Sequence, residues 1–149
     1  MSKLIASLIV STLAACAGRT PPPVAPPASC AASGPVLFEI DTNDLSAGPQ
    51  KQIVYASGAW QLDAAGGGTT TGCLAANDLA TIQHDVSAPW ESTDRGGIQC
   101  HMVHAPTNYI VNGKIVYVDS GCSSGVLDDA SRHALTEIEQ IMTTAATRH

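Results

Sequence analysis

Three groups of residues in this 149-residue chain are of types that could carry out chemistry. The first is the run CHMVH at residues 100–104, where thiol, thioether and imidazole groups, which suit copper, lie close together. On a strand, Cys100, Met102 and His104 would share one face, so at most three ligands converge. If Cys100 is oxidised, two remain. We therefore predict no metal and no cofactor, and keep Met102 and His104 as weak candidate metal ligands.

The second group is GCSSG at residues 121–125, which matches the G-x-S-x-G pattern around a nucleophilic serine. That arrangement needs an aspartate and then a histidine on later loops around a parallel sheet. The residues of those types that follow lie within one predicted helix and its tail: Asp128, Asp129, His133 and His149. A turn held by a disulfide explains the glycines without catalysis, so we predict that the protein is not an enzyme. A hydrolase reading would require that Ser123→Ala abolish activity.

The third group is the five cysteines, and their meaning depends on where the chain resides. Residues 1–15 contain one lysine, an apolar run and small residues before Cys16, the layout of an export signal. The polar, proline-rich residues after Cys16 prevent the apolar run from continuing as a membrane span. We therefore expect an exported chain, in which cysteines tend to form disulfides.

The sequence Leu13-Ala14-Ala15-Cys16 resembles the lipobox of bacterial lipoproteins. The resemblance implies cleavage before Cys16, attachment of lipid to its sulfur, and a location in the bacterial cell envelope, held at the outer membrane and facing the periplasm or the surface. An ordinary secretory signal is the alternative interpretation. Residues 16–33 then form a lipidated, proline-rich tether, because closely spaced prolines stiffen the chain as a spacer.

If Cys16 carries lipid, the four remaining cysteines, an even number, predict two disulfides among Cys30, Cys73, Cys100 and Cys122. Three connectivities are possible. We favour Cys100 with Cys122, since they flank a predicted hairpin, and Cys30 with Cys73 then follows by elimination. Closing the loop between Cys100 and Cys122 would stabilise the fold by about 3 kcal/mol.

Charge excludes some classes of partner. The net charge of −6 leaves no concentrated basic surface, so we expect no nucleic-acid partner. Anionic lipid head groups are disfavoured for the same reason, and the membrane contact is expected to be the lipid on Cys16 alone. The aspartates include no D-x-[DN]-x-[DN]-G loop, and the sequence therefore does not support a calcium site.

The elements that position these groups follow from turn and periodicity signals. Asn112-Gly113 between β-branched runs predicts a two-residue type I′ hairpin that pairs Val111 with Lys114 and Ile110 with Ile115, with both faces largely covered. In the continued register, Tyr109, Val111, Val116 and Val118 share one face and Ile110, Ile115 and Tyr117 share the other.

Residues 36–41 and 52–60 are predicted strands, the second bent at Gly58, with Trp60 in the core and a flexible loop at residues 66–71. The spacing of Leu79, Ile82 and Val86 predicts a helix that ends before Pro89, with His84 exposed. A second helix is predicted from Asp128 to about Ala145. We expect residues 34–149 to form one small α+β domain, an antiparallel sheet of four or five strands with two helices packed on it, stabilised by disulfides.

Several runs resemble those of small bacterial envelope lipoproteins without an assigned function: residues 55–60, 72–74, 88–90, 111–114 and 122–125, together with Cys100. The order of elements is also similar to that of emfourin-type peptidase inhibitors, in topology and without a shared residue motif.

These observations predict a non-enzymatic, lipid-anchored envelope lipoprotein whose domain binds a protein partner. One alternative is an inhibitor of an exported peptidase that inserts residues 64–72 or 106–108, which co-incubation with metallo- and serine peptidases would detect. The other is a copper-binding envelope lipoprotein, which requires a free Cys100 thiol.

Overall fold

The computed structural model of the protein describes residues 30–44, 48–94, 105–120 and 125–148. Their elements, in chain order, are β1 (Val36–Asp44), β2 (Gly48–Tyr55), β3 (Ala59–Asp63), β4 (Thr69–Cys73), α1 (Ala76–Ser87), β5 (Ser92–Asp94), β6 (Thr107–Val111), β7 (Lys114–Asp119), β8 (Gly125–Leu127) and α2 (Asp129–Thr147).

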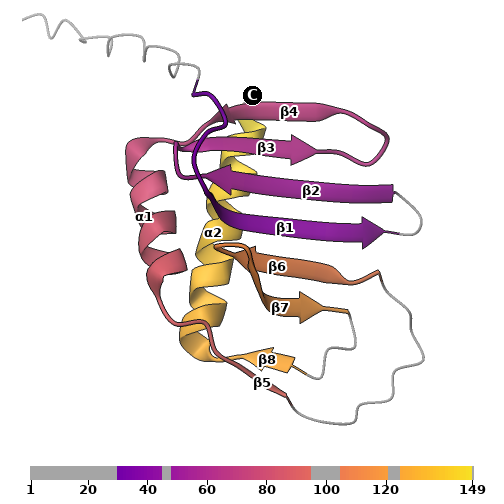
Figure 1. Ribbon diagram of the computed structural model, residues 1–149, viewed down its shortest axis with the longest axis vertical. Helices are drawn as coiled ribbons and strands as arrows, with labels where there is room; N and C mark the ends of the chain where they lie inside the picture. The colour runs from indigo at the N-terminus through magenta and orange to yellow at the C-terminus, as the bar shows by residue number, and fades with distance from the viewer. Residues whose placement is uncertain (1–29, 45–47, 95–104, 121–124, 149) are drawn as a thin grey trace, which may run out of the picture.

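The main structural element is a six-stranded antiparallel sheet in the order β4-β3-β2-β1-β6-β7. Helices α1 and α2 lie on one face of this sheet, and the small ribbon of β5 and β8 lies beyond β7 (Figure 1). The predicted α+β class, with two helices on an antiparallel sheet, is confirmed. The number of strands in the sheet is six rather than four or five.

The additional strands come from two places where sequence patterns pointed elsewhere. Residues 52–60 form parts of two strands, because the chain turns sharply between Tyr55 and Ala59, where Gly58 has a φ of +82°. The threonines at the end of the run expected to be a flexible loop begin β4, which pairs with β3. Gly66 and Gly67, both with positive φ, make the turn between these two strands.

The core lies between the sheet and the helices. Phe38 of β1 and Val54 of β2 are fully buried against Ile82 of α1 and Ile138 of α2. Both predicted helices are present and bury most of the expected apolar stripes, with Leu79 and Ile141 partly buried, and His84 is exposed as predicted. Asp128 caps α2, because its Oδ1 accepts a hydrogen bond of 2.8 Å from the backbone N–H of Ser131.

The β6–β7 hairpin has the predicted turn but a different register beyond it. Asn112 and Gly113 have φ values of +50° and +77°, as a type I′ turn requires. The first two pairs are those predicted, but a bulge then leaves Val116 out, so Tyr109 pairs with Tyr117. The prediction that Tyr117 and Tyr109 lie on opposite faces of the hairpin was therefore wrong.

Candidate functional site

The residues singled out from the sequence for metal, nucleophilic or lipid chemistry lie outside the described part of the chain. This applies to Cys16, Cys100, Met102, His104, Cys122 and Ser123. The lipidation site, the Cys100–Cys122 bond and the candidate copper ligands therefore stay predictions. Among the described residues, no group of three or more His, Cys, Asp or Glu side chains could hold a metal ion.

The Cys30–Cys73 part of the predicted pairing is confirmed. The two sulfurs are bonded at 2.01 Å with a Cα–Cα distance of 5.7 Å, which joins the chain ahead of β1 to the last residue of edge strand β4. Ser57 strengthens this attachment, since its Oγ donates to the carbonyl of Ala31 at 3.0 Å and accepts from Ser33 N at 3.4 Å. Residues 30–33, expected to belong to the tether, are bound to the sheet here.

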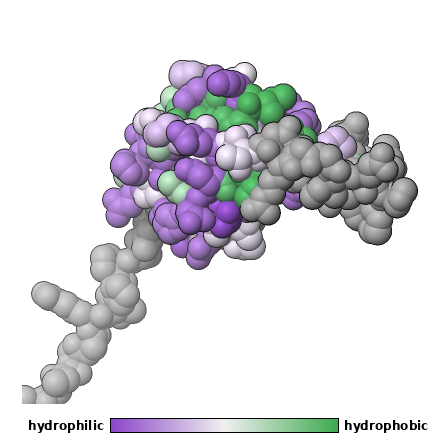
Figure 2. Space-filling model, turned by 90° about the horizontal axis from the view of Figure 1, so that it is seen from below, coloured by the Kyte–Doolittle hydropathy of each residue, from purple (hydrophilic) through white to green (hydrophobic). Residues whose placement is uncertain are grey.

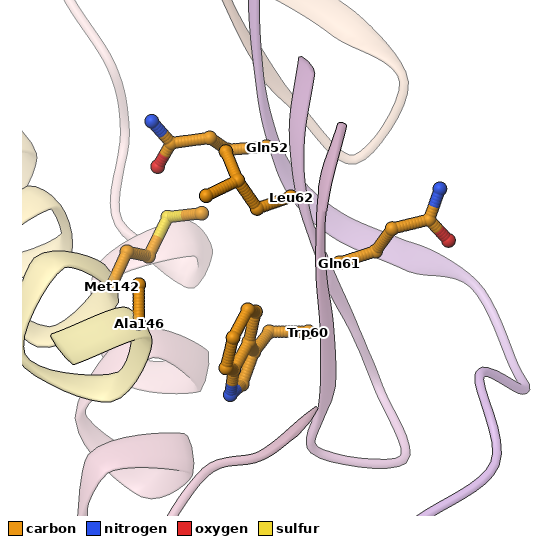
Figure 3. A pocket seen from close by; sticks show the side chains of 6 residues that line it. All are labelled: Gln52, Trp60, Gln61, Leu62, Met142 and Ala146. Carbon is orange, nitrogen blue, oxygen red and sulfur yellow. The ribbon is translucent and has the colours of Figure 1, made fainter. Parts of the chain in front are cut away.

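Tight packing continues inward from β4. Trp60 of β3 is 4% exposed, and a Cβ added to the neighbouring Gly72 would lie 2.6 Å from Cζ2 of its indole ring. A gap beside Trp60, toward Met142 and Ala146 of α2, has a volume of about 10 Å³ (Figure 3). A space of that size holds at most one water molecule. We refer to this end of the sheet, at β3 and β4, as the closed edge.

The opposite end of the sheet has a cleft of about 320 Å³ between β7, β8 and α2. We call it the β7–β8–α2 cleft. Its lining combines aromatic, apolar and charged side chains from the C-terminal part of the sequence: Tyr109, Tyr117, Asp119, Gly125, Val126, Leu127, Arg132, Leu135 and Glu139. Few polar groups set in a largely apolar wall are typical of binding sites.

A pair of tyrosines and a carboxylate form one wall of the cleft. The rings of Tyr109 and Tyr117 are 5.6 Å apart and tilted by 30°. Tyr109 Oη donates to Glu139 Oε1 at 3.1 Å. Burial, followed by the nearby Glu139 carboxylate, raises the pKa of Tyr109 above its ordinary value, so this tyrosine is a neutral hydrogen-bond donor at physiological pH.

Arg132 on the other side is already engaged. One guanidinium nitrogen, Nη2, donates to the carbonyl of Leu127 at 2.9 Å, and Nη1 lies 3.1 Å from Asp129 Oδ1. These contacts hold the guanidinium against the end of β8 and offset its charge. Within the described residues, the carboxylate of Glu139 accepts the hydrogen bond from Tyr109 and forms no ion pair.

Apolar surface lies next to this cleft. The large hydrophobic side chains exposed among the described residues are Ile115 (54%) and Val118 (39%), both on edge strand β7. The expectation that both hairpin faces are covered was therefore wrong. Seen from the side of β5 and β8, apolar surface gathers in two areas within a mainly hydrophilic face (Figure 2).

A second hollow, of about 280 Å³, lies between α1 and α2 and is lined by Asp78, Thr81, Glu137, Gln140, Ile141, Thr144 and Arg148. Its wall is mainly polar, and it has no aromatic side chain. Near it, Asp85 is 8% exposed, and its Oδ2 has no hydrogen-bond partner in the described part of the chain. Burial first, and then the charge of Glu137, raise the pKa of Asp85. This hollow is the weaker candidate.

The loops considered for peptidase inhibition are partly strands. Residues 64–68 form the β3–β4 turn, in which Ala64 N donates to the carbonyl of Gly68, whereas residues 69–72 belong to β4. Thr107 and Asn108 begin β6.

None of the described helices is both long enough and apolar enough to cross a membrane.

Sequence reasoning missed the cleft. Arg132, Leu135 and Glu139 recur at i, i+3 and i+7, a spacing that places them on one face of α2 and could have indicated a shared site. The tyrosine pair depends on the bulge in β7, for which the sequence carries no comparable signal.

In comparisons with known proteins, no family model, curated protein or solved structure matches this chain.

Proposed function

We propose that this protein is a non-enzymatic, lipid-anchored lipoprotein of the bacterial cell envelope whose domain binds another protein at the β7–β8–α2 cleft. The observation that carries the proposal is the position of the cleft relative to Cys30. A tether that precedes Cys30 would join the domain at the closed edge, because Cys30 is bonded to Cys73 in β4.

The distance between the two ends supports this arrangement. Four strands separate β4 from β7 in the sheet, and adjacent strands lie about 4.8 Å apart, so the two edge strands are about 24 Å apart. A domain held through the closed edge would direct the cleft away from the lipid anchor. A cleft in that position is accessible to proteins in the surrounding compartment.

The cleft and its surroundings have the composition of a protein-binding surface. Aromatic residues and arginine are enriched at such interfaces, and here Tyr109, Tyr117 and Arg132 line one cleft. Ile115 and Val118 add exposed apolar area on the adjoining strand. The described part of the cleft holds no grouping of side chains that would suit a nucleophile with its base.

The anchor is tested by mass spectrometry of the unreduced protein purified from its own envelope. We expect acyl chains on Cys16 and a chain that begins there. A chain that begins elsewhere, or an unmodified Cys16, would contradict the anchor while leaving the cleft untouched. Peptide mapping of the same sample also reports whether Cys100 is joined to Cys122.

The binding role is tested with two arginine substitutions at opposite edges. Val126→Arg places a bulky charge in the cleft, whereas Thr71→Arg adds the same charge on exposed β4. We expect the wild-type protein and Thr71→Arg to retain the same envelope protein from a detergent extract, and Val126→Arg to lose it. If Val126→Arg retains the envelope protein as well as the wild-type protein does, the proposal is contradicted.

A further inference from the structure

We propose that the β7–β8–α2 cleft receives a basic side chain, lysine or arginine, from the partner protein. This inference rests on the proposed function and specifies the chemistry of the contact. It depends on the position of one carboxylate, on two aromatic rings and on the size of the cleft.

The carboxylate is that of Glu139. Its Oε1 accepts the hydrogen bond from Tyr109, and within the described residues Oε2 has no hydrogen-bond partner. Glu139 is half-buried, so water screens its charge less than on an open surface. An ammonium or guanidinium group could donate to Oε2 without displacing Tyr109. The bond from Tyr109 would at the same time hold the carboxylate in place.

Arg132 does not supply that cation. Its guanidinium nitrogens are directed to the carbonyl of Leu127 at the end of β8 and to Asp129. A second cation that bound Glu139 would therefore add to the cleft rather than replace an existing ion pair. The net charge of −6 on the whole chain also favours the approach of a basic segment.

The tyrosines suit the rest of such a side chain. Lysine and arginine carry long apolar stems that pack along hydrophobic surface while the charged end reaches a polar group. The rings of Tyr109 and Tyr117 and the side chain of Leu135 all line the cleft and provide such surface, and an aromatic ring also attracts a cation. A volume of about 320 Å³ is at the small end of ligand sites, in keeping with one long side chain.

The test compares two dye-labelled tripeptides that differ in charge and little in shape, acetyl-Val-Arg-Val-amide and acetyl-Val-norleucine-Val-amide. Fluorescence anisotropy gives the Kd of each for the full chain in detergent. We expect weak binding, with a Kd of about 1 mM or tighter, and about a tenfold preference for arginine. Glu139→Gln keeps an acceptor for Tyr109 but removes the charge, and should reduce that preference to near one.

Glu137→Gln is the matched control, because it removes the same charge two residues earlier on α2 and outside the cleft lining. It should leave the tenfold preference intact. Equal affinity for the two peptides, no saturable binding, or equal effects of the two glutamine variants would overturn the inference. The inference would also be overturned if the protein self-associates and Glu139→Gln abolishes that self-association. The side chain in the cleft would then come from a second copy of this protein.

The two proposals fail separately. If Val126→Arg abolishes capture of an envelope protein but the tripeptides show no preference for arginine, the cleft binds a partner through other chemistry. If the preference for arginine is present but capture does not depend on Val126, the cleft binds a cation and the partner docks elsewhere.

Discussion

The two edges of the sheet differ in how their surfaces are used. At the closed edge, a disulfide joins Cys30 to β4, and the indole ring of Trp60 leaves no room beside Gly72. At the β7 edge, Ile115 and Val118 are exposed and a cleft of about 320 Å³ separates β7 from β8 and α2. The described structure thus has a disulfide at one edge and exposed apolar side chains beside a cleft at the other.

The contrast indicates a division of roles. Close packing and covalent bonds stabilise a fold, whereas exposed apolar side chains and a half-buried carboxylate contribute little to stability and suit a binding surface. Substitutions at the closed edge should therefore affect mainly folding, and those at the cleft should affect mainly binding. The following predictions are ordered from the largest expected effect to the smallest.

Removal of the Cys30–Cys73 bond should have the largest effect. In the chain-entropy model, a cross-link across a sequence separation of 43 stabilises the fold by about 4 kcal/mol. We expect the Cys30→Ser, Cys73→Ser double variant to lose about 2–4 kcal/mol in urea unfolding. A loss below about 1 kcal/mol would show that the bond does not restrict the unfolded chain in the way we describe.

A matched pair of glycine substitutions compares the edges directly. A Cβ at Gly72 meets the Trp60 ring at 2.6 Å, whereas a Cβ at Gly125 of β8 has no atom within 4 Å in the described structure. We expect Gly72→Ala to destabilise the fold by about 1–3 kcal/mol through overpacking. Gly125→Ala should change stability by about 0.5 kcal/mol or less. Thermal unfolding of both variants measures the difference, and equal losses would remove the distinction between the edges.

Asp85 should show the smallest effect, and one that depends on pH. Because burial raises its pKa, the folded state holds the proton more strongly than the unfolded chain does. This contribution to stability is fully present below the ordinary pKa of the carboxyl and is lost as the pH rises through the raised value. Asp85→Asn should therefore stabilise the protein at pH 7, with a gain that disappears in acid.

Asp128 provides the contrast for that experiment. Hydrogen bonds from Ser131 lower the pKa of Asp128, so its contribution is present at neutral pH and is lost as the pH falls through the lowered value. Asp128→Ala should destabilise the protein at pH 7. Unfolding by urea across a pH series distinguishes the two. A gain from Asp85→Asn that is the same at all pH values would contradict the role assigned to burial.

The predictable parts of the fold were those set by local sequence. Asn112-Gly113 determines its turn because both residues tolerate positive φ, and the apolar spacing along α2 matches the stripe that it buries. The number of strands could not be obtained in this way. Gly58 was expected to bend one strand, but it lies in the turn between two. β4 is exposed and rich in threonine, so its sequence lacks the apolar pattern of a strand, and only its pairing with β3 identifies it.

The candidate site was less predictable than the fold because it depends on distant contacts. Tyr109 and Tyr117 pair because the register shifts at Val116, and all three side chains pack against the core. Glu139 reaches Tyr109 across 30 positions of the chain. The cysteine pairing of Cys30 with Cys73 was reached by elimination, since export and an even number of cysteines limited the possibilities.

The most direct test of the account is photo-cross-linking of the full-length protein in its own envelope. A photoreactive amino acid is placed at position 126 in the cleft, and at position 71 on β4 as the control. The account predicts a defined adduct with one protein from position 126 and none from position 71. No adduct from position 126, or the same adduct from both positions, would contradict the claim that the protein binds its partner at the β7–β8–α2 cleft.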